Sequence, residues 1–221
     1  MIDDNINHEY IIRYLRDILP KREGLLKEME DYAAAHDVPI SQPETMRLLE
    51  VLTELTKAQN ILEVGCAIGY SAICMAQAGA GNIDTIEISE EMAKLAEENI
   101  KKAGLSARIH IHPGDAKEIL PRLDGQYDII FVDAAKAQYG EFFPHCMRML
   151  KTGGLLVSDN VLYKGMTATD ELMQRRKITI IKRLRNYLSM LSSHNELSTT
   201  VLPIGDGVAL SVHKKKELPN D

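Results

Sequence analysis

Two carboxylates and a side-chain amide follow two apolar runs that the sequence predicts to be strands of one sheet. Asp133 comes directly after residues 127–132, and Asp159 and Asn160 come directly after residues 154–158. If these strands are adjacent and parallel, their carboxyl ends emerge at one edge of the sheet, about 5 Å apart. Carboxylate and amide oxygens suit a hard cation such as Mg²⁺ and, without sulfur or imidazole, suit Zn²⁺ poorly. We therefore predict a metal site at Asp133, Asp159 and Asn160; the alternative is that Asp159 and Asn160 only cap a turn.

Lys136 follows Asp133 by three residues and should overhang the same site. An amine beside a dication is pushed towards its neutral form, so Lys136 is a candidate general base that takes a proton from a substrate hydroxyl. The alternative is an ordinary surface lysine. Its position after Asp133, and not its residue type, makes it a candidate.

A predicted strand, turn and helix start lie at residues 60–72. The apolar run 60–64 carries Glu63, and Gly65 and Gly69 precede Tyr70 and Ser71. Glycines at such a bend let the chain turn sharply and let a ligand approach the main chain, while the first helix amides offer donors to it. The glycine spacing differs from the Gly-x-Gly-x-x-Gly fingerprint of dinucleotide sites. A nucleoside-sized cofactor other than NAD is predicted; the alternative is a turn that only joins strand to helix.

Glu87 lies at the end of the second predicted strand, 22 positions after Gly65 (87 minus 65). An acid there can accept hydrogen bonds from both hydroxyls of a ribose. Ser89 is predicted to cap the next helix, which should leave Glu87 free for the ligand. After the third strand, Asp115 and Ala116 face the same crevice and are placed to border an adenine ring. The alternative for Glu87 is a solvated surface acid.

The elements that position these residues follow an α/β pattern. Strands are expected at 60–64, 82–88, 108–112, 127–132 and 154–158, and helices at 9–19, 22–36, 44–57, 169–190 and from about 70, 90, 116 and 139. Runs within the strands at 127–132 and 154–158, such as Ile-Ile-Phe-Val and Leu-Leu-Val, are apolar throughout, as in parallel sheets covered on both faces, so the sheet should be doubly wound. Residues 199–203 and 208–212 are predicted to form an antiparallel hairpin at its edge. We expect one domain, 1–221, with an N-terminal helical region 1–57, a core region 58–213 and a charged tail 214–221. The apolar stripe of the N-terminal helices is expected to pack in the core; the alternative is an interface with a partner subunit.

Composition narrows the classes of function. The formal charge of −6 argues against a protein that coats nucleic acid by general attraction, although the segment from Arg175 to Arg185 is locally basic and could steer phosphates. Three cysteines are an odd number, so reduced thiols are expected instead of a disulfide framework. The N-terminus lacks the pattern of a signal peptide, and no window of about 18 residues is apolar throughout, so we expect a soluble, cytoplasmic protein without a membrane partner.

The motif Glu63-x-Gly65-x-x-x-Gly69 resembles motif I of the class I methyltransferases, which bind S-adenosylmethionine (SAM). Nearly the whole chain is similar to the cation-dependent O-methyltransferases that include the catechol and caffeoyl-CoA enzymes, through the loop at Pro39-Ile40 and the motifs at 62–65, 133–136 and 159–160. The resemblance implies a Rossmann-like, seven-stranded sheet, a homodimer and Mg²⁺-dependent methyl transfer from SAM to a hydroxyl oxygen. It implies metal ligation by Asp133, Asp159 and Asn160, a base at Lys136, and SAM contacts at Ile40, Glu63, Gly65, Tyr70, Ser71, Glu87, Asp115, Ala116 and Asp133.

Within that family the chain resembles most the bacterial tRNA 5-hydroxyuridine methyltransferases, through residues 133–143, 159–165, 175–176 and 203–207. The resemblance implies methylation of the wobble uridine in the tRNA anticodon to 5-methoxyuridine, with Lys164, Arg175 and Arg176 contacting the substrate. A 5-hydroxyl beside the O4 carbonyl of uracil is a chelating oxygen pair like a catechol. The same chemistry on a small catechol-like or phenylpropanoid molecule stays open as the alternative. A protein that binds a nucleoside without catalysis is a third hypothesis, against which the four residues Asp133, Lys136, Asp159 and Asn160 speak together.

Overall fold

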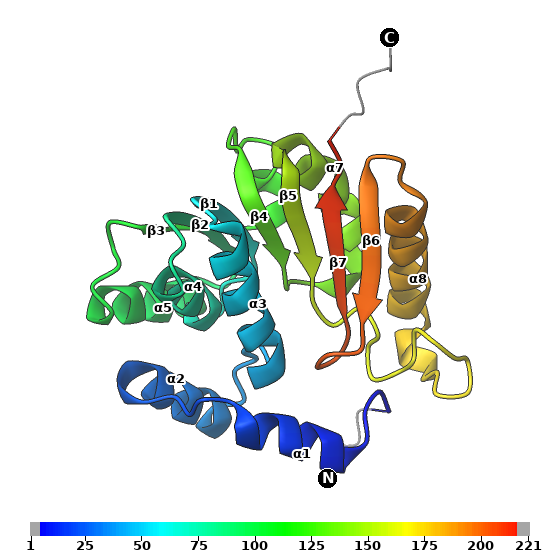
Figure 1. The fold of residues 1–221 in the computed structure, drawn as a ribbon, viewed down its shortest axis with the longest axis horizontal. Coiled ribbons are helices and arrows are strands. Elements are labelled where there is room, and N and C mark those ends of the chain that lie inside the picture. The colour runs from blue at the N-terminus through cyan, green and yellow to red at the C-terminus, as the bar shows by residue number, and fades with distance from the viewer. Residues whose placement is uncertain (1–4, 216–221) are drawn as a thin grey trace.

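The computed structural model describes residues 5–215, which contain a seven-stranded sheet with helices on both faces (Figure 1). The strand order is β3-β2-β1-β4-β5-β7-β6, in which β3 to β5 run parallel and β7 is antiparallel to both of its neighbours. The strands are β1 (Asn60–Val64), β2 (Asn82–Glu87), β3 (Ile109–Pro113), β4 (Tyr127–Val132), β5 (Leu150–Ser158), β6 (Leu197–Leu202) and β7 (Val208–His213). The predicted hairpin therefore closes one edge of the sheet.

The helices belong to two layers. They are α1 (Glu9–Ile18), α2 (Gly24–Ala35), α3 (Pro43–Thr56), α4 (Tyr70–Gln77), α5 (Glu90–Lys102), α6 (Ala116–Ile119), α7 (Tyr139–Met149) and α8 (Ile178–Ser193), with 3₁₀ turns at Lys136–Gln138 and Arg175–Lys177. Successive residues of a strand point to opposite faces, so Ile61 of β1 packs with α3, α4 and α5, whereas Leu62 packs with α7 and α8. This alternation of two apolar faces is what makes the sheet doubly wound.

Two expectations about helices are wrong. The helix predicted at 169–190 begins only at Ile178, after a loop over 160–174 that is held by a distant contact as well as a local turn. Arg185 donates to the Thr167 carbonyl at 2.9 Å, and Thr169 Oγ1 accepts from the Glu171 amide at 3.2 Å. The apolar stripe of α1 is not in the core of this chain. Ile12 is its one buried residue, while Tyr10 and Tyr14 are 69% and 65% exposed.

One carboxyl group is buried inside the sheet. Glu63 on β1 has no exposed surface and accepts hydrogen bonds from Thr85 Oγ1 on β2, at 2.5 Å, and from Ser71 Oγ on α4. The pKa of Glu63 is raised to about 7, chiefly by burial and to a smaller extent by the charges of Asp133 and Glu87, while the two hydrogen bonds act in the opposite direction. Glu63 therefore connects two strands and a helix at the turn after β1.

Glu63→Gln should flatten the dependence of stability on pH. The carboxyl has a pKa of 4.5 when unfolded and about 7 when folded. The unfolded chain therefore loses its proton first, and wild-type stability should fall as pH rises through this window, by on the order of 3 kcal/mol. Glutamine does not titrate. Urea unfolding of wild type and variant at about pH 5 and about pH 8 measures the free energy of unfolding of each protein at each pH. If this free energy falls equally in both proteins from pH 5 to pH 8, the raised pKa of Glu63 is contradicted.

Candidate active site

A cavity of about 350 Å³ lies at the carboxyl ends of β1, β2 and β4. This volume falls within the range of roughly 300–1,000 Å³ that is usual for small-molecule pockets. The loop before α3 forms one wall, and the segment from β4 to α7 forms another. Nine of the predicted site residues line it: Ile40, Gly65, Tyr70, Ser71, Glu87, Asp115, Ala116, Asp133 and Lys136.

Gly65 sits where the turn after β1 comes close to the end of the neighbouring parallel strand β4. Its φ is +105°, and a Cβ there would lie 2.2 Å from the carbonyl oxygen of Asp133. No side chain fits in that space, whatever ligand is bound. The sequence predicted a glycine that opens the main chain to a ligand; the structure adds a second reason, which is that the turn after β1 passes directly over the end of β4.

Glu87 is largely buried and is already hydrogen-bonded, which corrects the expectation that its carboxylate is free. Its Oε2 accepts from the amides of Cys66, at 3.2 Å, and Ala67, at 2.7 Å, while Oε1 accepts from the Ser89 amide at 2.9 Å. Ser89 also caps α5, as predicted, by accepting from the Met92 amide. A carboxylate has about four acceptor positions, so one remains on Oε1. Glu87 thus holds the turn after β1 and can still accept from one ligand hydroxyl.

The other predicted cofactor contacts are also held by the protein. Tyr70 donates its hydroxyl to Glu30 Oε1 on α2 at 2.6 Å. Ser71 donates to Glu63, which lies behind it and does not line the cavity. Asp115 caps α6 by accepting from the Lys117 amide at 2.9 Å. The wall of the cavity is therefore organised before any ligand enters.

The two predicted metal-binding carboxylates follow paired positions of neighbouring strands. Val132 of β4 is opposite Ser158 of β5, so Asp133 and Asp159 emerge side by side. The Asp159 amide donates to the Val132 carbonyl at 3.0 Å, which carries the parallel register into the site. Burial, followed by the charge of Asp133, raises the pKa of Asp159 well above its usual range. Two acids that repel one another at a buried position are a suitable place for a cation.

Three further residues, Lys136, Asn160 and Tyr139, contact this acid pair. Lys136 Nζ lies 3.3 Å from Asp133 Oδ1, so the predicted base reaches the predicted metal site. Asn160 adopts a left-handed backbone, with φ of 56°, and its amide donates to Asp159 Oδ1 at 2.7 Å. The hydroxyl of the buried Tyr139 donates to the Asp159 carbonyl at 3.0 Å. The local turn that was the alternative for Asp159 and Asn160 is therefore present, and it leaves Asp159 Oδ2 available.

The donor set fits a hard cation. Among residues 5–215, no three or more His, Cys, Asp or Glu side chains are arranged to ligate a metal. The set at this edge is smaller, two carboxylates and one amide, and it suits an ion such as Mg²⁺ that keeps several waters. The adjoining cavity has the size and the polar rim that a nucleoside cofactor requires.

The predicted substrate contacts lie outside the cavity. Lys164, Arg175 and Arg176 are exposed. Two other members of the basic segment, which the sequence suggested could steer phosphates, make hydrogen bonds within the protein. Arg183 donates to the Ala137 carbonyl at 3.0 Å, and Arg185 donates to the Thr167 carbonyl at 2.9 Å. Only part of the basic segment is left to meet a ligand.

Several lining residues were not predicted. Gln138 and Phe142 follow the motif at 133–136 and line the same wall, and Ile88 and Met92 lie at the Glu87 side. Phe142 is buried, and it also borders the cavity. Its position on the first turns of α7, directly after Asp133 and Lys136, is the feature of the sequence from which this role could have been predicted.

No helix in residues 5–215 is long and apolar enough to cross a membrane.

Comparison with known proteins gives consistent matches over most of the chain. Residues 20–215 match the family model described as O-methyltransferase. The catechol O-methyltransferase of Niastella koreensis is 33% identical, over 93% of this chain and 97% of that protein. A crystal structure from Staphylococcus aureus has a TM-score of 0.86 at 32% identity and covers 93% of this chain and 100% of that one. The O-methyltransferase from Bacillus cereus, in complex with SAH, has a TM-score of 0.82 at 27% identity over 93% of this chain and 97% of that one.

These matches confirm the predicted Rossmann-like class I methyltransferase fold, including the antiparallel hairpin formed by β6 and β7 beside β5. They also confirm that the enzyme is a SAM-dependent O-methyltransferase. The chain therefore belongs to the O-methyltransferase family of SAM-dependent enzymes.

Proposed function

We propose that this enzyme transfers the methyl group of SAM to a hydroxyl oxygen that has a second oxygen beside it, with Mg²⁺ or another hard divalent cation bound at Asp133, Asp159 and Asn160. One observation carries the proposal: the carboxylates of Asp133 and Asp159 follow paired residues of neighbouring strands, at the edge of the cavity. Such a cation, when bound, would lower the pKa of the hydroxyl and hold both substrate oxygens.

The protein's own residues supply binding, alignment and proton transfer. Glu87 has one acceptor position left for a ribose hydroxyl, and Asp115 and Ala116 border the adenine side of the cavity. Ile40 lines the cavity on the loop before α3, and we assign it to the methionine end of the cofactor. Lys136 takes the hydroxyl proton on Nζ, and Asp133 holds that amine in place at 3.3 Å. Because the sulfonium already provides the leaving group, alignment is most of what the reaction needs.

The preferred acceptor is 5-hydroxyuridine at the wobble position of tRNA. Lys164 is an exposed cation on the loop after β5, four residues after Asn160, and Arg175 and Arg176 are exposed cations in the 3₁₀ turn before α8. All three are free to meet phosphates of a bound tRNA. The alternative acceptor is a small catechol-like or phenylpropanoid molecule, which the 33% identity to a catechol O-methyltransferase supports. A cytoplasmic location goes with the tRNA assignment. A homodimer is also part of the proposal, because the exposed apolar face of α1 needs a cover.

The acceptor is tested by product analysis. With SAM and Mg²⁺, the enzyme should form 5-methoxyuridine on hypomodified tRNA, detected by mass spectrometry, and should turn over a panel of catechols poorly. The double variant Arg175→Ala with Arg176→Ala should raise the KM for tRNA and leave the KM for any catechol unchanged, since only tRNA brings phosphates. Turnover of catechols with no methoxyuridine formed would refute the tRNA assignment and leave the alternative.

Lys136→Ala should lower kcat by roughly 10²- to 10⁴-fold, the range expected for loss of a general base. Lys136→Arg should be nearly as slow, because arginine keeps the positive charge but stays protonated. Lys101→Ala, at an exposed position on α5, is the matched control and should turn over normally. Steady-state kinetics at saturating SAM provide the test, and an active Lys136→Arg enzyme would exclude the role of base.

Asp159→Ala should abolish most methyl transfer while SAM binding, measured by calorimetry, survives. The physical reason is that Asp159 belongs to the acceptor side of the cavity edge and does not line the cofactor cavity itself. Retained SAM binding also shows that the variant is folded. Near wild-type turnover of this variant would remove the basis for a cation held between the two strands.

A further inference from the structure

The loop that follows the predicted metal ligands has an unusual backbone. Asn160, Tyr163 and Lys164 have positive φ angles of 56°, 46° and 56°, and Gly165 has one of 77°. A left-handed conformation costs a residue with a side chain roughly 1–2 kcal/mol, so three of them in one short segment must be held by contacts from elsewhere. The segment Asn160–Gly165 is called the acceptor loop below.

The turn between β6 and β7 provides those contacts. The Val161 amide donates to the Gly207 carbonyl at 2.9 Å, and the Leu162 amide donates to the Asp206 carbonyl at 3.0 Å. Asp206 adds a side-chain contact, because its Oδ1 accepts from the Lys164 amide. A Cβ at Gly207 would lie 2.3 Å from Leu162 Cγ, so the two segments are in direct contact.

The same turn is fixed on its other side. The Pro203 carbonyl accepts from Asn7 Nδ2 at 2.6 Å, and a Cβ at Gly205 would lie 2.6 Å from Thr45 Oγ1 on α3. The turn thus lies between the helical region that borders the cofactor cavity and the acceptor loop. A turn anchored in this way can impose a conformation on the loop that it contacts.

Asp206 is also close in the fold to the predicted metal ligands. Its carbonyl accepts from the Leu162 amide and its Oδ1 accepts from the Lys164 amide, two and four residues after Asn160. Groups that hydrogen-bond behind a metal-binding residue orient it, and their removal typically lowers metal affinity about 10- to 100-fold.

We propose that Asp206 is a positioning residue for the metal site: its carboxylate holds the Lys164 amide, and the acceptor loop so fixed places the side-chain oxygen of Asn160 beside Asp133 and Asp159. The inference rests on the proposed function, since it assumes a cation there. It assigns Asp206 no contact with SAM. Asp206 acts through the conformation of the loop, and the geometry of its acceptor oxygen matters more than its charge.

Binding of Mn²⁺ to the full chain, followed by the electron paramagnetic resonance of the free ion, measures this role without any turnover. Asp206→Ala should weaken Mn²⁺ binding about 10- to 100-fold. Asp206→Asn should bind nearly as wild type, because the amide oxygen still accepts from the Lys164 amide. Asp206→Glu should bind weakly although it keeps the charge, because the longer side chain moves the acceptor; this variant decides the matter if Asp206→Ala does not fold.

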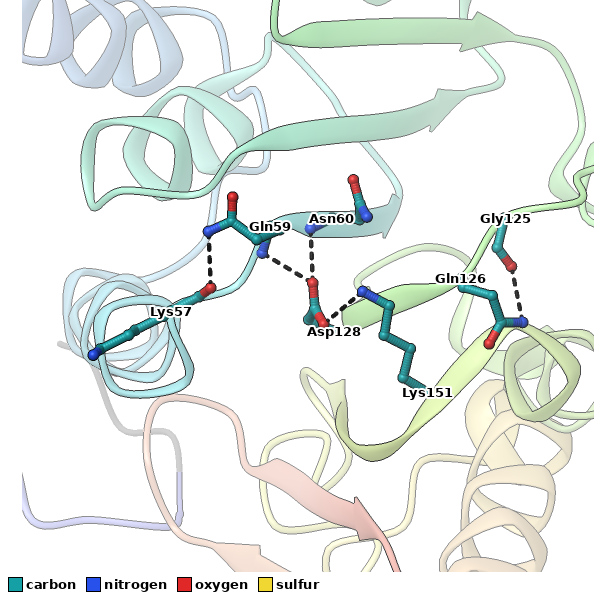
Figure 2. A network of polar contacts seen from close by, with 7 residues as sticks. All are labelled: Lys57, Gln59, Asn60, Gly125, Gln126, Asp128 and Lys151. Carbon is teal, nitrogen blue, oxygen red and sulfur yellow. Dashed lines mark hydrogen bonds and ion pairs between the residues drawn. The ribbon is translucent and has the colours of Figure 1, made fainter.

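Asp128 offers a matched control at the other end of β4, away from the predicted metal ligands. Its Oδ2 accepts from the amides of Gln59 and Asn60, both at 2.9 Å, and its Oδ1 accepts from Lys151 Nζ at 2.8 Å (Figure 2). Asp128→Ala removes comparable backbone hydrogen bonds and should lower the Tm while leaving Mn²⁺ affinity unchanged. This control distinguishes weaker Mn²⁺ binding that is caused by general destabilisation from weaker binding that is caused by displacement of Asn160.

The outcomes distinguish the two proposals. If wild type and Asp159→Ala show the same absence of Mn²⁺ binding, the metal site of the proposed function fails, and this inference fails with it. If wild type binds Mn²⁺ and the Ala and Glu variants of Asp206 bind equally well, only the inference is overturned. An Asp206→Asn enzyme as weak as Asp206→Ala would show that charge is what matters, which also overturns positioning by the hydrogen bond.

Discussion

The parallel register between β4 and β5 is the constraint on which the site depends. Val132 is opposite Ser158, and the next residue on each strand is a carboxylate. A slip of one residue would turn one of the two side chains to the other face of the sheet and separate the acids. The same end of β4 is crossed by the turn at Gly65, where no side chain fits. The cofactor cavity and the acid pair therefore share the carboxyl end of β4, and Asp159 is added from the end of β5. The register between these strands thus sets where the cavity and the two acids lie relative to one another.

Most of what lies in the sheet could be predicted from the sequence. Buried parallel strands are apolar throughout and short, so Asp133 and Asp159 stand out as the first polar residues after them. The loop over 160–174 could not be predicted, because its conformation is set by distant partners: Asp206 and Gly207 hold its first half, and Arg185 holds the Thr167 carbonyl. Periodicity there favoured a helix, since it reports local preference and not long-range contacts. The exposed stripe of α1 was missed for a related reason: a pattern shows that a face is apolar but not what covers it.

The acids of the site show the same limit of position-based reasoning. Glu87 was identified from its distance after Gly65, but the three amides that it accepts from come from Cys66, Ala67 and Ser89, and only the folded turn brings the first two to it. Glu63 carries the motif that identifies the family, yet it is buried behind Ser71 and supports the helix that opens at the cavity. A motif can thus mark a site through residues that shape it as well as through residues that touch the ligand.

The acceptor side is organised by a chain of contacts from the N-terminal segment through the turn between β6 and β7 to the loop after β5, and the cofactor side by the turn after β1. Both meet at Asp133 and Asp159. The most direct test of this arrangement is anomalous diffraction from crystals grown with Mn²⁺ and SAH. The account predicts one strong peak within bonding distance of the side-chain oxygens of Asp133, Asp159 and Asn160, at the edge of the SAH-filled cavity. A fully bound SAH with no peak there, or with manganese at other residues, would contradict it.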